Sequence, residues 1–504
     1  MTDVTATFGP PMREIAAEPQ LHNFLHAGHT SQTPGGHCCI IAQDPPLKRY
    51  RPRLNWLIPT LIPALISSIL IASGSGNAFG TVLGALPTQP SIEVSSALFP
   101  QAVPGFDQEQ GLTLPSAPLA EDSTAGRGVR SGGVFVQPSL DLGIGYDSNV
   151  LGARGGSGGA ILSQTPAVSL TTQGSVVRVG AFLDAEKSTY LDQPRQSRTD
   201  YRAAIGTTAD LGKNSLTFGY SHLYLHDDPA AIGSIAAGEP TPYDVDDLRL
   251  SGRIELGRLS VLPFGDFSHW SYGHVRIGGI DTDQSVRNRS LIQVGSAARL
   301  VIGEQRDLLA SLSFVSTQYD RRFGASDSPS SIGVLALGGV DYELDATLRA
   351  RVLAGLQARV YTSRFNRSQM VAVGQLALTW LPQKQTEVSL AISRSLEDLA
   401  QEDPGGTIYA RAELAVRHEY LRNFVLRART GITSVEFLQI GSTQTSGYVG
   451  SGFEWDITRH WRLVGNAQVS RVSSPVRILS QGSQGVAGGP YTRVQTGLRL
   501  VAAL

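Results

Sequence analysis

The sequence predicts an all-β fold, a transmembrane antiparallel up-and-down β-barrel of about 18 strands that follows a disordered N-terminal region. Three observations support this prediction. Beyond residue 80, no apolar run approaches the roughly 18 residues that a membrane helix needs. From residue 133 onward, segments in which apolar and polar residues alternate follow one another. The connections between these segments alternate between short turns and long polar loops, as they do in outer-membrane barrels.

Composition excludes some classes of protein before any motif is considered. Only 17% of the 504 residues are charged and the formal net charge is −1. A nucleic-acid partner is not expected, because such proteins normally present a basic surface. Cys38 and Cys39 are the only cysteines, and a body without thiols is compatible with an oxidising compartment. No cofactor is expected.

Residues 47–78 have the order of a secretory signal peptide. A basic cluster that begins at Lys48 precedes the apolar stretch 54–72, and small residues ending in Ala78 follow it. This order predicts export through the inner membrane and cleavage before Phe79. The alternative is a retained membrane anchor, because the apolar run is about 19 residues long.

The segments on either side of the signal show no core-forming pattern. Residues 1–46 are expected to be either a disordered extension or sequence that lies ahead of the natural start, with translation beginning near Leu47. Their histidines and cysteines match no standard zinc spacing, so no metal site is expected there; they are His22, His26, His29, His37, Cys38 and Cys39. Residues 79–132 are rich in Pro, Gly and Ser, which is typical of a flexible periplasmic segment.

Alternation with a period of two residues predicts the strands of the barrel, which is assigned to residues 133–504. In the segment 134–146 the apolar side chains share one parity and the polar ones the other. Successive side chains of a strand point to opposite faces, so each such segment has one apolar face and one polar face. The same pattern recurs in 198–211, 247–256, 346–360 and 407–419.

Loop lengths and aromatic residues predict how the barrel is oriented. Turns of a few residues are expected on the periplasmic side and longer loops on the extracellular side, with aromatic residues near both interfaces. A soluble β-sandwich or propeller is the alternative, but no internal repeat emerges. The long polar loops are expected around 148–160, 227–244, 273–286, 320–331, 396–406 and 474–489.

The first predicted strand carries a motif that resembles a known family. The stretch Gly-Ile-Gly-Tyr-Asp-Ser-Asn, with Gly143, Tyr146, Asp147 and Asn149 as its characteristic residues, resembles the start of a family of β-barrel porins of proteobacteria. The resemblance covers residues 133–504. It implies an outer-membrane barrel of a Gram-negative bacterium, a family often found with exopolysaccharide or capsule export genes. The implied partners are outer-membrane lipid, the barrel-assembly machinery and polysaccharide export components. The chain departs from such barrels in ending at Leu504 without a terminal aromatic residue.

Arginines dominate the polar parity and form the predicted lumen lining. A ladder of arginines inside a pore could pass an anionic polymer through weak, repeated contacts. Alternatively, the acidic residues on the same face pair with them across strands. The set comprises Arg178, Arg198, Arg202, Arg249, Arg253, Arg287, Arg289, Arg299, Arg349, Arg351, Arg359, Arg411, Arg417, Arg427 and Arg429, continued by Arg462, Arg493 and Arg499.

The expected function is that of a porin-like channel rather than an enzyme, passing anionic exopolysaccharide or small polar solutes. Two alternatives stay open. The first is a structural barrel with a plugged lumen. The second is a barrel hydrolase with a rim site, because a histidine beside carboxylates could activate water; its candidates are His226, Asp227, Asp228, His269 and His274.

Overall fold

The computed structural model describes residues 128–172, 174, 176–230, 237–320, 330–363, 366–397, 406–438, 441–473, 476–479, 483–487 and 489–503. The chain divides into Met1–Gly76 and Asn77–Leu504, and every described residue belongs to the second unit. The predicted extension 1–46, the predicted signal peptide 47–78 and the predicted periplasmic segment up to residue 127 lie outside the described residues.

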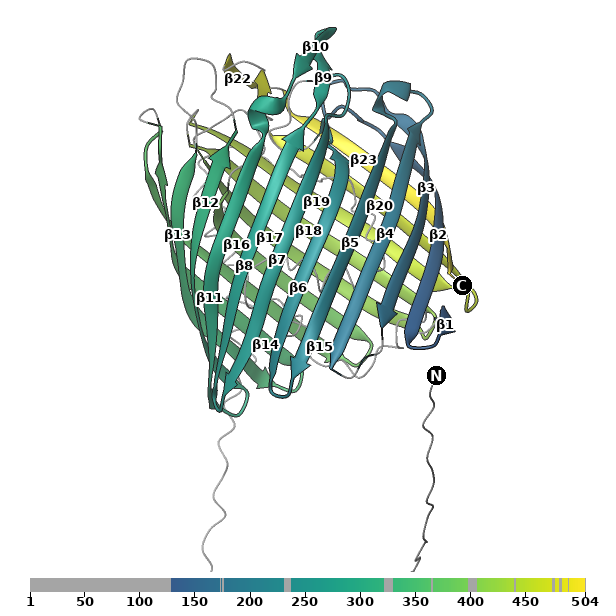
Figure 1. The fold of residues 1–504 in the computed structure, drawn as a ribbon. Helices are drawn as coiled ribbons and strands as arrows, with labels where there is room; N and C mark the ends of the chain where they lie inside the picture. Colours follow the sequence, from purple (N-terminus) through teal and green to yellow (C-terminus); the bar gives the residue numbers. More distant parts are fainter. Residues whose placement is uncertain are drawn as a thin grey trace, which may run out of the picture. The chain divides into compact units, whose positions relative to one another are not determined.

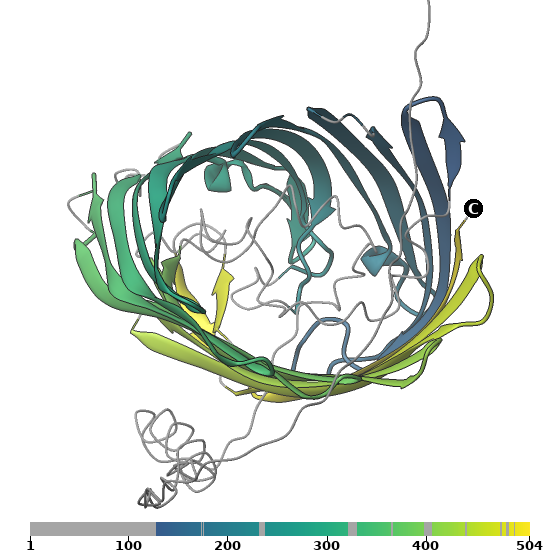
Figure 2. The ribbon, with the colours of Figure 1, turned by 90° about the horizontal axis from the view of Figure 1, so that it is seen from below.

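An antiparallel barrel of 18 strands confirms the predicted fold class (Figure 1). Seen from below, the strands form a ring around an interior (Figure 2). The strands are β2 (Val134–Asp147), β3 (Gly159–Thr172), β4 (Val177–Tyr190), β5 (Arg198–Leu211), β6 (Asn214–His226), β7 (Pro242–Leu256), β8 (Leu259–Tyr272), β11 (Arg289–Gly303), β12 (Arg306–Tyr319), β13 (Ser331–Asp345), β14 (Leu348–Tyr361), β15 (Gln369–Gln383), β16 (Thr386–Glu397), β17 (Thr407–Leu421), β18 (Phe424–Phe437), β19 (Ser442–Asp456), β20 (Trp461–Ser473) and β23 (Tyr491–Ala503).

Each strand pairs with its neighbour in sequence, apart from two places where a loop holds a hairpin of its own. β9 (His274–Ile277) and β10 (Ile280–Asp283) pair only with each other, so β8 pairs with β11. β21 (Val476–Leu479) and β22 (Ser483–Ala487) form the second hairpin, between β20 and β23. The sequence predicted these two segments as loops; β9, β10 and β22 are labelled at the upper rim in Figure 1.

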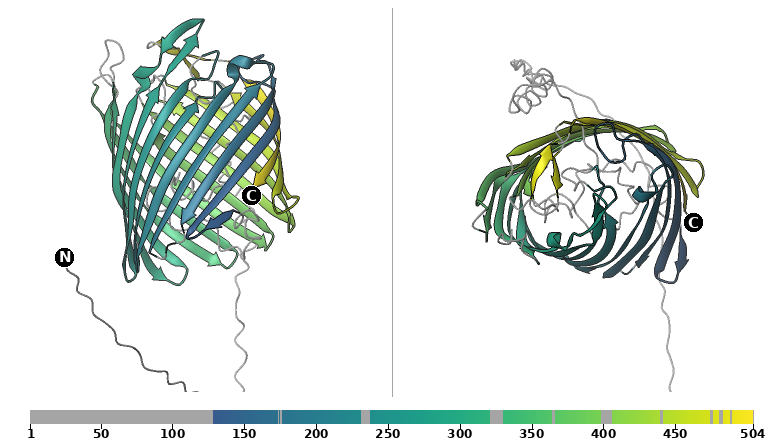
Figure 3. Two further views of the ribbon diagram at one scale, coloured as in Figure 1. Left: turned by 45° about the vertical axis from the view of Figure 1, so that its right-hand side comes forward. Right: turned by 90° about the horizontal axis from the view of Figure 1, so that it is seen from above.

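The first and last strands close the ring. β2 pairs with β23 from Ser139 opposite Ala503 to Asp147 opposite Gln495. The lower end of β2 projects beyond β23, and there β1 (Val129–Ser131) folds back and pairs with residues 134–136 of β2. Closure matters because lipid offers no partner for backbone N–H and C=O groups. Figure 3 shows the closed ring from above and the β2–β23 side of the barrel.

The two faces of the wall differ as the alternation predicted. On β12, Leu308, Leu312 and Phe314 are exposed on the outer face, whereas Asp307 and Ser313 on the opposite parity are buried. In a barrel, alternate residues of a strand point outward and into the interior, so the exposed apolar residues form the outer face and the polar residues form the inner face. No helix in the described part of the chain is long and apolar enough to span a membrane.

Turns at the two ends of the barrel differ in length. Two-residue turns join β5 to β6 and β7 to β8, and each begins with a glycine at positive φ, Gly212 at 76° and Gly257 at 72°. Such backbone angles are typical of tight hairpin turns. The opposite rim carries the longer connections, including the segment 227–241 between β6 and β7. Because β2 starts and β23 ends at the short-turn end, both chain ends of the barrel lie on that side.

Candidate functional site: the charged inner wall and the mouth of the barrel

Most of the predicted arginines bind carboxylates of neighbouring strands. Arg349 and Arg351 both bind Asp341, with Nη2–Oδ2 distances of 2.8 and 2.7 Å. Arg202 binds Asp184 at 2.5 Å, and this carboxylate is fully buried. Paired charges of this kind are an ordinary feature of a wet lumen, so the structure favours pairing for most of the set.

The remaining arginines are placed as follows. Arg289 lies over the Trp270 ring, and Arg429 lies over Tyr448 and donates to Gln468. Arg359 is buried on β14, and Arg253 lies on β7 opposite Ser215. The other pairs are Arg178–Asp210, Arg198–Asp200, Arg249–Asp266, Arg287–Asp227, Arg299–Asp307, Arg411–Glu413, Arg427–Glu454, Arg462–Asp456, Arg493–Asp147 and Arg499–Asp141.

Arg417 differs from the rest of the predicted set. It lies on β17 directly opposite Arg427 of β18. Within the described ranges it forms no ion pair, although Glu387 is its register neighbour on β16. Like charges placed directly opposite each other destabilise a strand pair. Since Arg427 already binds Glu454 at 3.0 Å, this part of the wall carries a guanidinium that a mobile anion could neutralise.

A cavity of about 530 Å³ lies at the short-turn end of the wall. Its polar lining comes from Arg299, Asp307, Asp341 and Arg349, together with the β11–β12 turn. Both signs of charge line it, so it can hold water and small ions of either sign.

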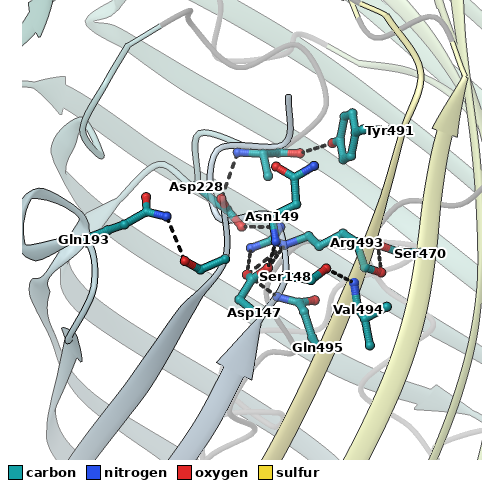
Figure 4. Close-up of polar contacts among 12 residues, drawn as sticks. Asp147, Ser148, Asn149, Gln193, Asp228, Ser470, Tyr491, Arg493, Val494 and Gln495 are labelled. Atoms are coloured by element: carbon teal, nitrogen blue, oxygen red, sulfur yellow. Dashed lines mark hydrogen bonds and ion pairs between the residues drawn. The ribbon is translucent and has the colours of Figure 1, made fainter. Parts of the chain in front are cut away.

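The family motif ties the first strand to the last (Figure 4). The Asp147 carboxylate is fully buried and accepts three hydrogen bonds from Arg493, at 2.6 to 3.0 Å. It also accepts bonds from the Gln495 side chain and the Asn149 backbone N–H. Arg493 in turn reaches Asp228 at 3.1 Å. We call Asp147, Arg493 and Asp228 the closure cluster.

The other motif residues shape the loop after β2. The Asn149 side chain donates to the Ala153 carbonyl at 2.8 Å and accepts from its N–H at 3.1 Å, which closes a tight loop. A Cβ on Gly143 would lie 2.2 Å from Ser163 Oγ, so a larger residue there would displace the Ser163 side chain. Tyr146 is exposed on the outer face. The sequence indicated these positions as a motif without their contacts, because partners such as Gln495 lie at the far end of the chain.

The segment after β6 crosses the mouth of the barrel. Asp228 binds Arg493, and the Ala230 carbonyl accepts a hydrogen bond from Tyr491 at 3.1 Å. Both partners are on β23, and β5, β4, β3 and β2 lie between β6 and β23 in the ring. The segment is held on its other side as well, since Gln196 donates to the Gly238 carbonyl at 2.6 Å. Residues 228, 230 and 238 therefore lie at the long-loop opening of the barrel.

The electrostatics of Asp228 keep this contact charged. Burial by itself would raise the pKa of the Asp228 carboxyl, but the guanidinium groups of Arg493 and Arg198 and the Ala230 N–H hold it below its ordinary value. A depressed pKa means that the carboxylate stabilises the contact at every pH above its usual titration range. The contact weakens only when the pH falls through the depressed pKa.

The residues of the predicted hydrolase site do not come together. Asp227 binds Arg287, and Asp228 belongs to the closure cluster. His226 binds Asp200 at 2.7 Å, while His269 contacts Ser290 and Ser271. His274 lies on the β9–β10 hairpin, 3.3 Å from Asp281. Nucleophile, base and orienting group would have to lie within hydrogen-bond reach of one another, and among these five residues the structure gives no such set.

A closed antiparallel barrel with an outward apolar face and a polar inner face defines a β-barrel protein of the outer membrane. The chain belongs to the family described as Putative beta-barrel porin 2, whose model matches residues 123–487. This assignment confirms the family that the motif at Gly143 indicated. Among curated protein sequences, none matches the chain.

Solved outer-membrane structures resemble the chain at low sequence identity. The ferric-catecholate import receptor Fiu of E. coli K12, in its open form, is 9% identical, with 75% of this chain and 82% of that chain covered and a TM-score of 0.42. OccAB3 of Acinetobacter baumannii is 10% identical, with coverages of 74% and 99% and a TM-score of 0.40. OccK2 (OpdF) of Pseudomonas aeruginosa, solved in complex with glucuronate, is 10% identical, with coverages of 76% and 98% and a TM-score of 0.41.

Proposed function

We propose that this protein is a passive channel of the outer membrane that passes small polar solutes and anionic polysaccharide, and that it has no catalytic activity. Its family and its strand number support the proposal, because a barrel of this size is too wide for side chains alone to fill. Export by the signal peptide at 47–78 and insertion by the barrel-assembly machinery belong to the same proposal, as does a polysaccharide export complex as partner.

The single observation that favours anionic solutes is the arrangement of Arg417 opposite Arg427. Elsewhere on the inner parity, carboxylates neutralise most arginines, so the number of arginines alone does not favour anions. At this pair two guanidinium groups lie side by side, with Glu454 bound to Arg427 and Glu387 in register with Arg417 but not ion-paired to it. An anion that passes along β17 and β18 would relieve the repulsion between the two guanidinium groups. Arginine suits this role because its planar fork binds carboxylates and phosphates.

Replacing both Arg417 and Arg427 with Gln should reduce selectivity for anions. We expect the anion-to-cation permeability ratio to fall about fivefold, the factor that corresponds to about 1 kcal/mol for one charge contact in water. The measurement is the reversal potential in planar bilayers under a salt gradient. Arg471→Gln is the control, because Arg471 is exposed on the outward parity of β20.

The same variants test whether the channel prefers an anionic polysaccharide. An acidic oligosaccharide built of uronate units should block the current of the natural protein, and the double variant should be blocked less, whereas an uncharged oligosaccharide of equal length should affect both alike. A barrel that conducts no current at any voltage would contradict the channel itself. Equal block by both polymers would contradict only the preference for anions.

A barrel with a closed mouth is the second candidate, and the contacts of Asp228, Ala230 and Gly238 at the mouth are the observation that favours it. Asp228→Asn removes a charge-assisted hydrogen bond and should shift the ratio of open to closed states by about tenfold, which matches the lower limit of about 1.5 kcal/mol for a bond to a charged group. Single-channel recording at neutral pH measures this ratio. Asp281→Asn is the control, because Asp281 is exposed on β10 and, among the described residues, forms an ion pair only with His274.

The pH dependence of gating follows from the depressed pKa of Asp228. The natural protein should keep its open-to-closed ratio from pH 7 down to about 4, near the ordinary aspartate pKa of about 3.9. Opening should increase only below that pH, as the carboxylate takes up a proton. The Asp228→Asn variant should lack this acid-induced opening. If the two proteins respond identically between pH 7 and pH 3, the mouth segment does not gate the barrel.

A further inference from the structure

The wall of the barrel is incomplete between β15 and β16 at their extracellular ends. β14 and β15 are paired up to Arg359 opposite Gln369, whereas the pairing of β15 with β16 ends at Gly374 opposite Arg394. Within the described residues, positions 369–373 of β15 therefore have no strand on that side. Apolar side chains are exposed outward at this level, with Met370 at 66% and Val360 at 60%. An unpaired strand edge beside lipid is costly.

A side chain occupies part of this open edge. The Arg394 guanidinium donates a hydrogen bond to the Ala372 carbonyl at 2.5 Å, where a backbone N–H of β16 would otherwise be expected. Arg394 is exposed and shares the outward parity of β16 with Ile392 and Leu390. A cation therefore lies on the outer surface at the open end of the seam.

The tips of β16 and β17 lie on the inner side of the neighbouring wall. The Gln357 side chain of β14 donates to the Leu396 carbonyl at 2.8 Å and accepts from its N–H at 3.0 Å, although β15 lies between β14 and β16 in the ring. Leu396 and its register partner Ile408 share a buried cluster with Val371 and Val373 of β15. The two edges thus overlap, and the described contacts that hold them are the Gln357 amide, the Arg394–Ala372 hydrogen bond and the apolar cluster.

An apolar row on the inner parity leads to this overlap. Inward-facing positions of an outer-membrane barrel are normally polar. Here the buried cluster continues from β8 to β15 along the interior, through Leu262, Ala297, Leu309, Leu337 and Leu353. The row ends at the seam, where the exposed Arg394 guanidinium lies on the outer side.

We propose that the β15–β16 seam is a lateral gate through which a single-chain anionic amphiphile, such as a fatty acid, passes between the outer leaflet and the apolar row of the interior. Arg394 binds the carboxylate head group at the outer end of the seam. The alkyl chain replaces the contacts that Leu396 and Ile408 make with β15, and the Gln357 side chain releases the Leu396 backbone. This lateral route adds to the axial route of the proposed channel and does not depend on it.

Locking the seam tests the gate. The barrel strands contain no cysteine, and Cys38→Ala with Cys39→Ala removes the two at the N-terminal end. In that background, Gln357→Cys with Leu396→Cys places two thiols across the seam, where the Gln357 side chain contacts the Leu396 backbone in the natural protein. A short bifunctional thiol reagent that can be cleaved by reduction would join them. Leu312→Cys with Ala336→Cys is the matched control, because these residues are register partners in the fully paired β12–β13 seam.

The probe is a dansyl-labelled fatty acid in liposomes that contain the full chain, read as the saturable part of energy transfer from tryptophan. Cross-linking the β15–β16 seam should abolish the saturable signal, and cleavage of the cross-link by a reducing agent should restore it. Ionic conductance should not change. The control cross-link should leave both readouts unchanged. Undiminished fatty-acid uptake by the locked barrel would overturn the proposal, as would a parallel loss of conductance.

A second variant keeps the test decisive if the cysteine pair fails to fold. Arg394→Gln should weaken binding of the labelled fatty acid by about tenfold, the factor that corresponds to the loss of a charge-assisted bond. It should not change binding of the labelled alcohol of equal chain length. Equal effects on acid and alcohol would exclude Arg394 as the head-group site, and no effect on either would overturn the gate.

Discussion

Arg493→Gln is expected to destabilise the barrel by about 3 to 5 kcal/mol, the usual cost of removing one partner from a buried ion pair. The side chain is 3% exposed and neutralises Asp147, which is fully buried, and Asp228. Without it, two carboxylates are left beside each other at the junction of β2 and β23. The free energy of unfolding in urea, together with heat-dependent mobility in detergent gels, measures the effect.

The exposed pair Arg178–Asp210 provides the control for this prediction. Its side chains are 59% and 40% exposed, so Arg178→Gln should cost about 1 kcal/mol or less. Adding Asp147→Asn and Asp228→Asn to Arg493→Gln should recover part of the loss, because no buried charge then lacks a partner. If Arg493→Gln and Arg178→Gln prove equally mild, the closure cluster does not stabilise the barrel.

Leu250→Arg is expected to destabilise the membrane-inserted barrel by about 2 to 4 kcal/mol, the cost of an arginine on the lipid face near the bilayer midplane. Leu250 is 50% exposed on the outer parity of β7. Leu256→Arg is the matched control, since Leu256 shares that strand and parity but lies beside the Gly257 turn, where the cost falls to about 0 to 1 kcal/mol.

The readout for this pair is the inserted fraction after refolding into lipid vesicles and the free energy of unfolding from them. Val352→Arg on β14, also outward and exposed, should behave like Leu250→Arg. Equal tolerance of Leu250→Arg and Leu256→Arg would contradict the assignment of the outer face to lipid, as would recovery of the natural protein as a soluble monomer.

Strands, faces and turns could be predicted because they depend on residues close together in sequence. Alternation in 346–360 predicted the two faces of β14, including exposed Val352 and buried Arg351. Tertiary contacts could not be predicted, because each one depends on the register between strands. The sequence therefore did not reveal that Arg349 and Arg351 share Asp341, nor that Gln495 contacts Asp147.

Local patterns also failed where the chain leaves the regular wall. The sequence pattern placed Leu396 at the start of a polar loop, yet it belongs to β16 and is 2% exposed because the strand tip lies inside β15. The hairpins β9–β10 and β21–β22 lie in segments whose polar character predicted plain loops. The alternation within single strands does not predict the apolar row from Leu262 to Val373, because its members come from different strands and align only in the folded ring.

The buried carboxylate of Asp147 has a consequence for biosynthesis. Its guanidinium partner is 346 positions later in the chain, so the charge stays uncompensated until the final strand has been delivered. The pairing of β2 with β23 joins strands far apart in the sequence, and such long-range contacts form late. A polypeptide truncated before residue 491 would keep an unpaired strand edge on β2 and, at the same place, the Asp147 carboxylate without its arginine partner. Cellular quality control could use this combination to distinguish an incomplete barrel from a complete one.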